Sequence, residues 1–179
     1  MSRLFVLALL VAGCSSTPQF ESDWERNHAA ELAGEESVAL PPYPKSENLL
    51  PVYVSATSDF KYFVDASTLT ASPKAREIRY VLVARSPSGV DNVSYEAIRC
   101  PEEFRVLATG EGPGKWSSRP GAWRPIVKGA ALSWPYALSH NYFCPHRDPI
   151  RTAAEGVDAL RRGSHPAVYV EQQNRGGAN

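Results

Sequence analysis

The sequence predicts an α+β fold: an antiparallel β-meander of about five or six strands, with a C-terminal helix packed on the sheet and an extended N-terminal arm in front. Two observations support this prediction. From about Leu49 to Ala108 the chain is a series of short runs rich in valine, tyrosine and isoleucine, separated by turn residues. After Asp148 the apolar residues recur at helical spacing instead. Short strands joined by tight turns favour an antiparallel meander, because parallel strands need long crossover connections.

Residues 1–13 are predicted to be a signal peptide. A single positive charge, Arg3, precedes the apolar run 4–12, which is too short to span a bilayer as a helix. The sequence Val11-Ala12-Gly13-Cys14 resembles the lipobox of bacterial lipoproteins, in which the leader is cleaved before the cysteine. The resemblance implies that Cys14 carries acyl chains, palmitate among them, on its sulfur and its new amino group. The other interpretation is an ordinary thiol behind an ordinary signal peptide.

This lipoprotein prediction sets the expected location. Several acyl chains on one residue anchor a protein stably, whereas a single chain gives only marginal binding. No polybasic block lies next to Cys14, so we expect the membrane to be held by lipid rather than by charge. Ser15 resembles an outer-membrane sorting context, since aspartate at that position typically retains enteric lipoproteins in the inner membrane. The expected location is therefore the cell envelope, at the outer membrane, with its periplasmic and surface faces both left open.

Residues 14–48 are expected to form a lipidated tether. The segment is rich in acidic side chains, has few large apolar residues and ends in the proline-rich sequence 40–44. One short helix is predicted inside it, because Ser22 and Glu25 form a capping box. The prolines then impose an extended or polyproline backbone. Such a tether either holds the domain away from the membrane or packs back onto it.

The globular β-rich domain is predicted over residues 49–165. Its expected strands are Val52–Val54, Lys61–Asp65, Glu77–Arg85, Val93–Arg99 and Phe104–Ala108. The run Glu77–Arg85 has branched apolar residues at both odd and even positions, which predicts a central strand with two buried faces. The turn 86–89 ends this strand, and the next run is expected to return antiparallel to it. No regular element is assigned from residue 113 to Cys144.

The clearest helix signal lies near the end of the chain. Asp148 is the expected N-cap, Pro149 the first helical residue and Gly163 the C-terminal stop. The apolar face that we expect to cover the sheet is made by Ile150, Ala153, Ala154, Val157 and Leu160. Residues 166–179 are expected to be a tail.

Three details of this helix are also predicted. The pairs Arg151–Glu155 and Asp158–Arg162 have the i,i+4 spacing of ion pairs on its outer face. Gly156 costs about 1 kcal/mol relative to alanine in a helix interior, but it allows close packing.

Cys100 and Cys144 remain once Cys14 is assigned to lipid. A cysteine pair in an exported bacterial chain indicates a disulfide, and a loop of about 45 residues closed in this way contributes about 4 kcal/mol in the chain-entropy model. The competing interpretation is a redox or metal pair. The long stretch between the two cysteines is unlike a CxxC redox motif.

Several short motifs resemble the cryptic neisserial protein family, whose members are exported or lipid-anchored proteobacterial proteins. They are Pro44-x-x-Glu47-Asn48-Leu49-Leu50-Pro51, Phe63-Val64-Asp65, Arg79-Tyr80, Arg85-Ser86-Pro87-Ser88-Gly89, Ile98-Arg99-Cys100, Trp123-Arg124-Pro125-Ile126 and Tyr142-Phe143-Cys144-Pro145. The resemblance covers about residues 40–163, implies an envelope protein and supports pairing Cys100 with Cys144. The strand–Cys100–strand layout is also similar, more generally, to surface-adhesin E-like domains. Neither family supplies a catalytic or ligand-binding residue.

Composition and motifs argue against several function classes. Lysine plus arginine and aspartate plus glutamate number 19 each, so there is no basic excess to neutralise a nucleic acid. His140 and His146 flank Cys144, but zinc would need a third or fourth ligand, so neither a metal nor a cofactor is expected. The sequence has no GxSxG, HExxH or lysine-bearing phosphate loop. We therefore expect no enzymatic activity and name no catalytic residue.

The remaining candidates are aromatic and basic. The residues proposed to bind a ligand are Trp116, Arg119, Trp123 and Arg124, because exposed tryptophans beside arginines stack on sugar rings or anchor partner proteins. The alternative is that the tryptophans fill the core or staple the long loop. Two functional hypotheses follow: a non-catalytic, adhesion-like interaction module with an unknown protein partner, and a binder of envelope glycan or peptidoglycan.

Overall fold

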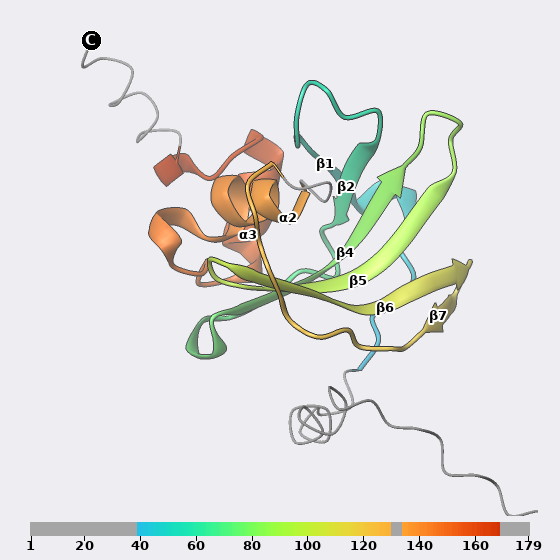
Figure 1. Cartoon of the computed structure of the whole chain (residues 1–179), viewed down its shortest axis with the longest axis horizontal. Coiled ribbons are helices and arrows are strands. Elements are labelled where there is room, and N and C mark those ends of the chain that lie inside the picture. The colour runs from blue at the N-terminus through green and yellow to red at the C-terminus, as the bar shows by residue number, and fades with distance from the viewer. Residues whose placement is uncertain (1–38, 130–133, 169–179) are drawn as a thin grey trace, which may run out of the picture. The chain divides into compact units, whose positions relative to one another are not determined.

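The computed structural model describes residues 39–129 and 134–168 (Figure 1). Four predictions fall outside these ranges: the signal peptide, the lipidation of Cys14, the short helix at Ser22 and all but the first three residues of the tail. Within them, no helix is both long enough and apolar enough to cross a bilayer.

One antiparallel sheet of eight strands organises the domain. The strands are β1 Leu49–Val52, β2 Lys61–Asp65, β3 Thr70–Ser72, β4 Glu77–Arg85, β5 Asp91–Arg99, β6 Glu103–Gly112, β7 Lys115–Ser117 and β8 Arg124–Pro125. The main path runs β1-β2-β4-β5-β6-β7. The short β3 and β8 pair with the first parts of β4 and β6, whereas β2 and β7 pair with their later parts. The predicted antiparallel meander is therefore confirmed.

The strand β4 is central, as its sequence pattern predicts. It pairs with β2 and β3 on one side and with β5 on the other. Ile78, Tyr80 and Leu82 belong to the main hydrophobic core, while Val81 and Val83 on the opposite face are also buried. Both faces of this strand are thus removed from water, which explains why its sequence shows no simple alternation of apolar and polar residues.

The edge of the sheet differs from the prediction. The first strand covers Leu49–Val52 rather than Val52–Val54. Leu49 and Leu50 pair with the end of β2, and the chain leaves the sheet at Tyr53, whose N–H donates instead to the Tyr142 hydroxyl at 3.1 Å. Pro51 lies in this edge strand and is exposed, a position where the missing N–H is tolerated.

A helical layer packs on one face of the sheet, and its first part, before the predicted C-terminal helix, is the larger departure from the prediction. α2 (Trp134–Ala137) continues into the π-helix η3 (Leu138–Phe143), where no element was expected. The fully buried Leu138, Tyr142 and Phe143 join the core beneath β2, β4 and β5. The described residues also form the 3₁₀ turns η1 Ser46–Asn48, η2 Pro73–Ala75 and η4 Pro145–Arg147.

The predicted C-terminal helix is α3, Ala153–Arg162, and it lies with α2 and η3 on the same side of the sheet (Figure 1). Its start was predicted wrongly: the N-cap is Thr152, not Asp148. Thr152 Oγ1 accepts the Glu155 N–H, and the Glu155 carboxylate accepts the Arg151 N–H at 2.7 Å. The helix starts later than predicted because Ile150 fills the core from an extended segment before the first turn.

The predictions for Gly156, Gly163 and the Asp158–Arg162 pair are confirmed. Gly163 ends α3 in the left-handed conformation (φ +80°), and Asp158 pairs with Arg162 at 2.7 Å. Gly156 is a point of close approach: a Cβ there would lie 2.6 Å from both Ile150 Cδ1 and Leu69 Cδ2. The glycine therefore sets how closely α3 lies against the core.

Two other predictions for this helix are wrong. Ala154 is exposed, and the buried alanine on this helix is Ala159. Glu155 accepts the Arg151 backbone N–H and pairs with His165 at 3.1 Å, instead of forming the predicted ion pair with the Arg151 side chain.

Candidate functional site

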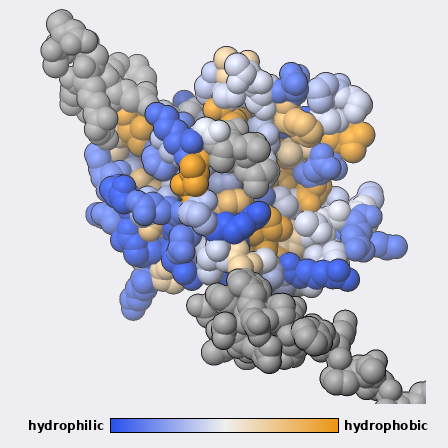
Figure 2. All heavy atoms as spheres, in the orientation of Figure 1, coloured by the Kyte–Doolittle hydropathy of each residue, from blue (hydrophilic) through white to orange (hydrophobic). Residues whose placement is uncertain are grey.

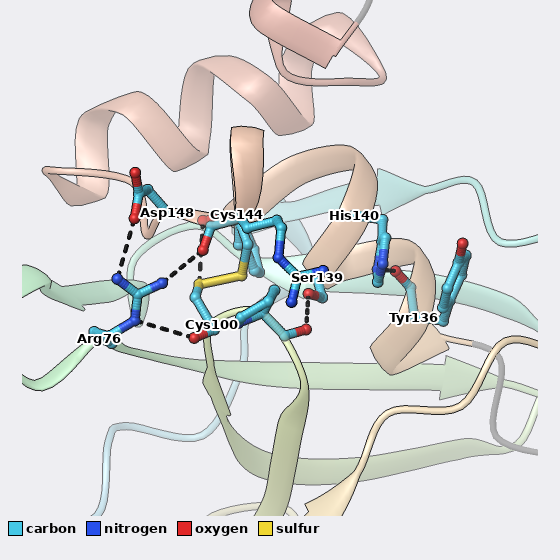
Figure 3. The surroundings of a disulfide bond; sticks show 10 residues. Arg76, Cys100, Tyr136, Ser139, His140, Cys144 and Asp148 are labelled. Atoms are coloured by element: carbon cyan, nitrogen blue, oxygen red, sulfur yellow. Dashed lines mark hydrogen bonds and ion pairs between the residues drawn. A yellow bond between two sulfur atoms is a disulfide. The ribbon is translucent and has the colours of Figure 1, made fainter.

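The disulfide joins the sheet to the helical layer. Cys100 follows β5, Cys144 follows η3, and their Cα atoms are 5.6 Å apart across the bond (Figure 3). Both cysteines are buried. The predicted disulfide is confirmed, and its position indicates a structural role, since it fixes the segment from η3 to η4 against the β5–β6 turn.

Arg76 extends this connection at the surface. Its guanidinium donates to the Cys100 carbonyl at 3.2 Å, to the Arg147 carbonyl at 2.6 Å and to Asp148 Oδ1 at 3.1 Å (Figure 3). Arg76, His146 and Arg147 all have positive φ, between 52° and 70°, in the left-handed region that non-glycine residues rarely adopt. The hydrogen bonds of Arg76 hold the backbone in this conformation, so we call these residues the clamp around the disulfide.

The two histidines near Cys144 do not converge on a site. His140 stacks on Tyr136 with ring centroids 4.0 Å apart, and its Nδ1 lies 3.2 Å from the Tyr136 carbonyl oxygen (Figure 3). His146 is exposed on η4. Across residues 39–129 and 134–168, no three His, Cys, Asp or Glu side chains gather in a way that could hold a metal ion.

The opposite side of the sheet has a different character. We call it the second face: the side that carries Val81, Val83, Val93, Tyr95 and Ala97 and points away from α2 and α3. All five residues are buried although they lie outside the main core. Their cover comes partly from the proline-rich segment before β1, which crosses this face.

This segment, residues 39–45, is named the strap. The Trp116 indole N–H donates to the Pro41 carbonyl at 3.0 Å, and the Tyr43 ring packs against Trp116 with centroids 5.4 Å apart. Farther along, the Lys45 N–H donates to Asp65 Oδ2 at 3.4 Å. The strap therefore runs from β7 toward the β1–β2 edge, and Figure 1 shows this cyan segment passing behind β5 and β6.

Gly110 makes room for the strap. A Cβ at this position would lie 2.8 Å from the Tyr43 hydroxyl and 3.0 Å from Val93 Cβ, so any larger residue would push the tyrosine away from the sheet. Burial raises the pKa of the Tyr43 hydroxyl, and the nearby Asp91 carboxylate raises it further. Tyr43 is therefore held neutral against the sheet.

A hollow of about 480 Å³ opens beside the strap. Its lining combines residues of the strap, buried valines of the second face and two acidic side chains. The lining residues are Tyr43, Pro44, Ser46, Leu49, Val83, Asp91, Val93, Gly110, Glu111, Gly112 and Pro113. The Arg85 guanidinium pairs with Asp91 through two contacts, at 2.7 and 2.9 Å, and this holds the pKa of the Asp91 carboxyl below its usual value. The hollow thus combines apolar side chains with the Glu111 carboxyl group and the Asp91–Arg85 ion pair.

The four candidate binding residues are distributed over both sides of the sheet. Trp116 holds the strap, while Trp123 lies toward the other end of β6, where the guanidinium carbons of Arg99 and Arg105 are 4.1 and 4.5 Å from its ring centroid. Arg124 instead lies over Phe104, a residue of the main core, at 4.8 Å. Arg119 is exposed in the loop after β7. The structure does not bring these four residues into one site.

A buried carboxylate escaped the sequence analysis. Glu96 on β5 is 1 % exposed and accepts hydrogen bonds from Ser94 Oγ at 2.7 Å, Tyr80 OH at 3.1 Å and Trp134 Nε1 at 3.1 Å. Burial raises the pKa of its carboxyl, and the three donors oppose that rise. Trp134 also stacks on Tyr62. The cluster ties α2 to the sheet, and an acidic residue inside a predicted apolar strand was its signal in the sequence.

Comparisons with known proteins give one match. The model of the CNP1-like family matches residues 28–161, which is well over half of the chain. No curated protein and no solved structure matches the chain.

Proposed function

The chain belongs to the CNP1-like family, and on that premise we propose that it is a cell-envelope protein, held to the membrane by acyl chains on Cys14, that acts as a non-catalytic, adhesion-like interaction module. The observation that supports this most directly is the contrast between the two faces of the sheet. One face is filled by the helical layer, whereas the second carries the strap, the hollow and the Trp123 cluster. A rigid sheet with a hollow and a partly exposed aromatic cluster on one side suits the binding of a partner.

The envelope location is supported by two features. The lipobox-like sequence ends at Cys14, and the disulfide between Cys100 and Cys144 belongs to an oxidising compartment. Replacing the lipid-bearing residue (Cys14→Ser) should move the protein from the membrane pellet to the soluble fraction of cells. Mass spectrometry of the native protein supplies the control, because it should find acyl chains on Cys14 as the first residue. Unchanged fractionation, or an intact leader, would contradict the anchor.

The interaction role can be tested at the hollow. A photo-crosslinking amino acid placed at Glu111, at the border of the hollow, should capture a discrete partner in cells. The matched control is the same amino acid at Asp158, which is exposed on α3 on the other side of the sheet. Capture at Glu111 alone supports the proposal. Equal capture at both positions, or no capture at either, would count against it.

The glycan alternative rests on Trp116 and Trp123, which are both only partly exposed. The Trp116 indole N–H is already used by Pro41, and the Trp123 ring already packs against two guanidinium groups. These contacts favour a protein partner over a sugar that needs a free ring face. Retention of the protein on peptidoglycan, lost in a Trp116→Ala/Trp123→Ala variant, would reverse this preference.

A further inference from the structure

The strap packs on Trp116 and Gly110, beside Val93, and we call this surface, together with the adjoining hollow, the groove. We propose that the groove is a receptor for a proline-rich segment of a partner protein, and that the strap is a ligand of the same chemistry supplied by the chain itself. The inference rests on the proposed function, since it names the class of partner that an interaction module of this shape would bind. It begins from the sequence of the strap, Ala39-Leu40-Pro41-Pro42-Tyr43-Pro44-Lys45.

Proline fixes its own φ and disfavours helix in the residue before it, so this sequence is extended before it binds. No regular secondary structure is formed from residue 39 to residue 45. A segment of this kind loses little conformational entropy on docking, which is why proline-rich peptides are common ligands of aromatic grooves.

The groove has the groups that such a ligand requires. A proline-rich ligand needs an aromatic ring beside it and a donor for its backbone carbonyls. Trp116 supplies both: its indole N–H donates to the Pro41 carbonyl at 3.0 Å. The Tyr43 ring packs on that same indole, and its hydroxyl end lies over Gly110, where even one added carbon would collide with it. The contacts are made by the proline carbonyl and the tyrosine ring, so a peptide from another protein with these two groups would find the same partners.

The hollow shows how a partner could compete with the strap. A covalently attached segment acts at an effective concentration in the millimolar range for short linkers, so an external peptide needs contacts that the strap does not make. The hollow begins beside Tyr43 and is lined by the Glu111 carboxylate and by Asp91, which already pairs with Arg85, so Glu111 is the acceptor left for a partner's side chain. A proline-rich segment that also carries a lysine or arginine could place that side chain there. The chemistry therefore indicates a Pro-Pro-aromatic-Pro segment with a neighbouring basic residue.

The test uses the full chain in detergent, ¹⁵N-labelled at tryptophan, and a synthetic peptide of residues 39–46, with the indole N–H signal of Trp116 as the readout. A Tyr43→Ala variant weakens the resident strap, and we expect it to bind the peptide at least tenfold more tightly than the unaltered chain does. Adding Gly110→Ala to that variant should weaken peptide binding at least tenfold, because the new Cβ occupies the place of the peptide's tyrosine. A peptide with its prolines replaced by alanine is the matched control.

The proposal is overturned if the folded Tyr43→Ala variant does not bind the peptide, if the proline-free peptide binds equally well, or if Gly110→Ala has no effect. Should Tyr43→Ala fail to fold, the milder Tyr43→Leu variant takes its place, and a Trp116 signal that does not move when millimolar peptide is added to this variant overturns the proposal. Sedimentation of the same samples tests whether a second copy of the chain occupies the groove instead. A dimer that the peptide dissociates would assign the groove to that copy and would also overturn the proposal. Persistent crosslinking from Glu111 without peptide binding would remove this inference alone and leave the proposed function intact.

Discussion

Replacing Gly156 with alanine separates two effects that act in opposite directions on α3. In an exposed helix interior the change should stabilise the protein by about 1 kcal/mol, because glycine has the greater backbone entropy to lose. At this position, however, the added Cβ would lie 2.6 Å from Ile150 Cδ1 and 2.6 Å from Leu69 Cδ2. Carbon atoms in contact are normally about 3.5–4.0 Å apart, so each methyl group would have to move by roughly 1 Å.

Both methyl groups belong to buried side chains. Ile150 is 0 % exposed and Leu69 is 4 % exposed, and both belong to the main core. Overpacking a core of this kind costs about 1–3 kcal/mol. The packing cost offsets the helix-propensity gain and exceeds it in most of that range. We therefore expect Gly156→Ala to lower the free energy of unfolding by up to about 2 kcal/mol.

The assay is urea denaturation followed by circular dichroism, with Ala154→Gly as the matched control. Ala154 is exposed on the same helix, so its replacement should report helix propensity alone and cost about 1 kcal/mol. Shortening the obstructing side chain with Leu69→Val should restore part of the loss in the Gly156→Ala background. If Gly156→Ala raises the free energy of unfolding by the full propensity gain, the close-packing argument is refuted.

Three further predictions concern the disulfide, its clamp and the buried carboxylate. Replacing Cys100 and Cys144 together by alanine, which opens a loop with a sequence separation of 44, should cost about 4 kcal/mol in urea denaturation; a midpoint equal to that of the oxidised protein would contradict this. Arg76→Ala should lower the free energy of unfolding by about 1–2 kcal/mol, because Arg76 donates to two carbonyls and a carboxylate. The control Arg162→Ala, which breaks one exposed ion pair, should lower it by about 0.3–0.5 kcal/mol. Equal losses in the two variants would refute the clamp. Burial raises the pKa of the Glu96 carboxyl in the folded state, so its contribution to stability is fully present below its pKa in the unfolded chain and is lost as pH rises through the folded value. Glu96→Gln should therefore flatten the decline in stability above about pH 4, and parallel stability curves for the two proteins would be inconsistent with a raised pKa.

The parts of the fold that the sequence predicts are those with a repeated pattern. The run Glu77–Arg85 identifies the central strand, and Gly163 marks the end of α3, because a long apolar run and a left-handed stop each have one simple reading. The strands β3, β7 and β8 are only two or three residues long, too short to show any periodicity. The helical start at Thr152 was missed because Asp148 and Pro149 give the same local signal four residues earlier.

The contacts of the candidate site residues could not be predicted from the sequence either, because they join residues far apart along the chain. Trp116 and Trp123 stand out in the sequence, but sequence spacing does not reveal the contacts of their indole groups. Trp116 contacts Pro41 and Tyr43, and Trp123 contacts Arg99 and Arg105. Figure 2 shows hydrophobic groups on the visible surface as separate small patches rather than one broad area, so composition alone gave no position for a binding surface.

Pro51 restricts the ways in which this protein can join others. The open side of β1 would normally offer a row of backbone donors and acceptors to any passing strand, and that exposure leads to edge-to-edge aggregation. A proline in a four-residue strand breaks the row, and its ring keeps a neighbouring backbone at a distance. At the other end, β7 has only three residues to offer. Such a sheet resists growing by added strands, which favours recognition through side chains over strand addition.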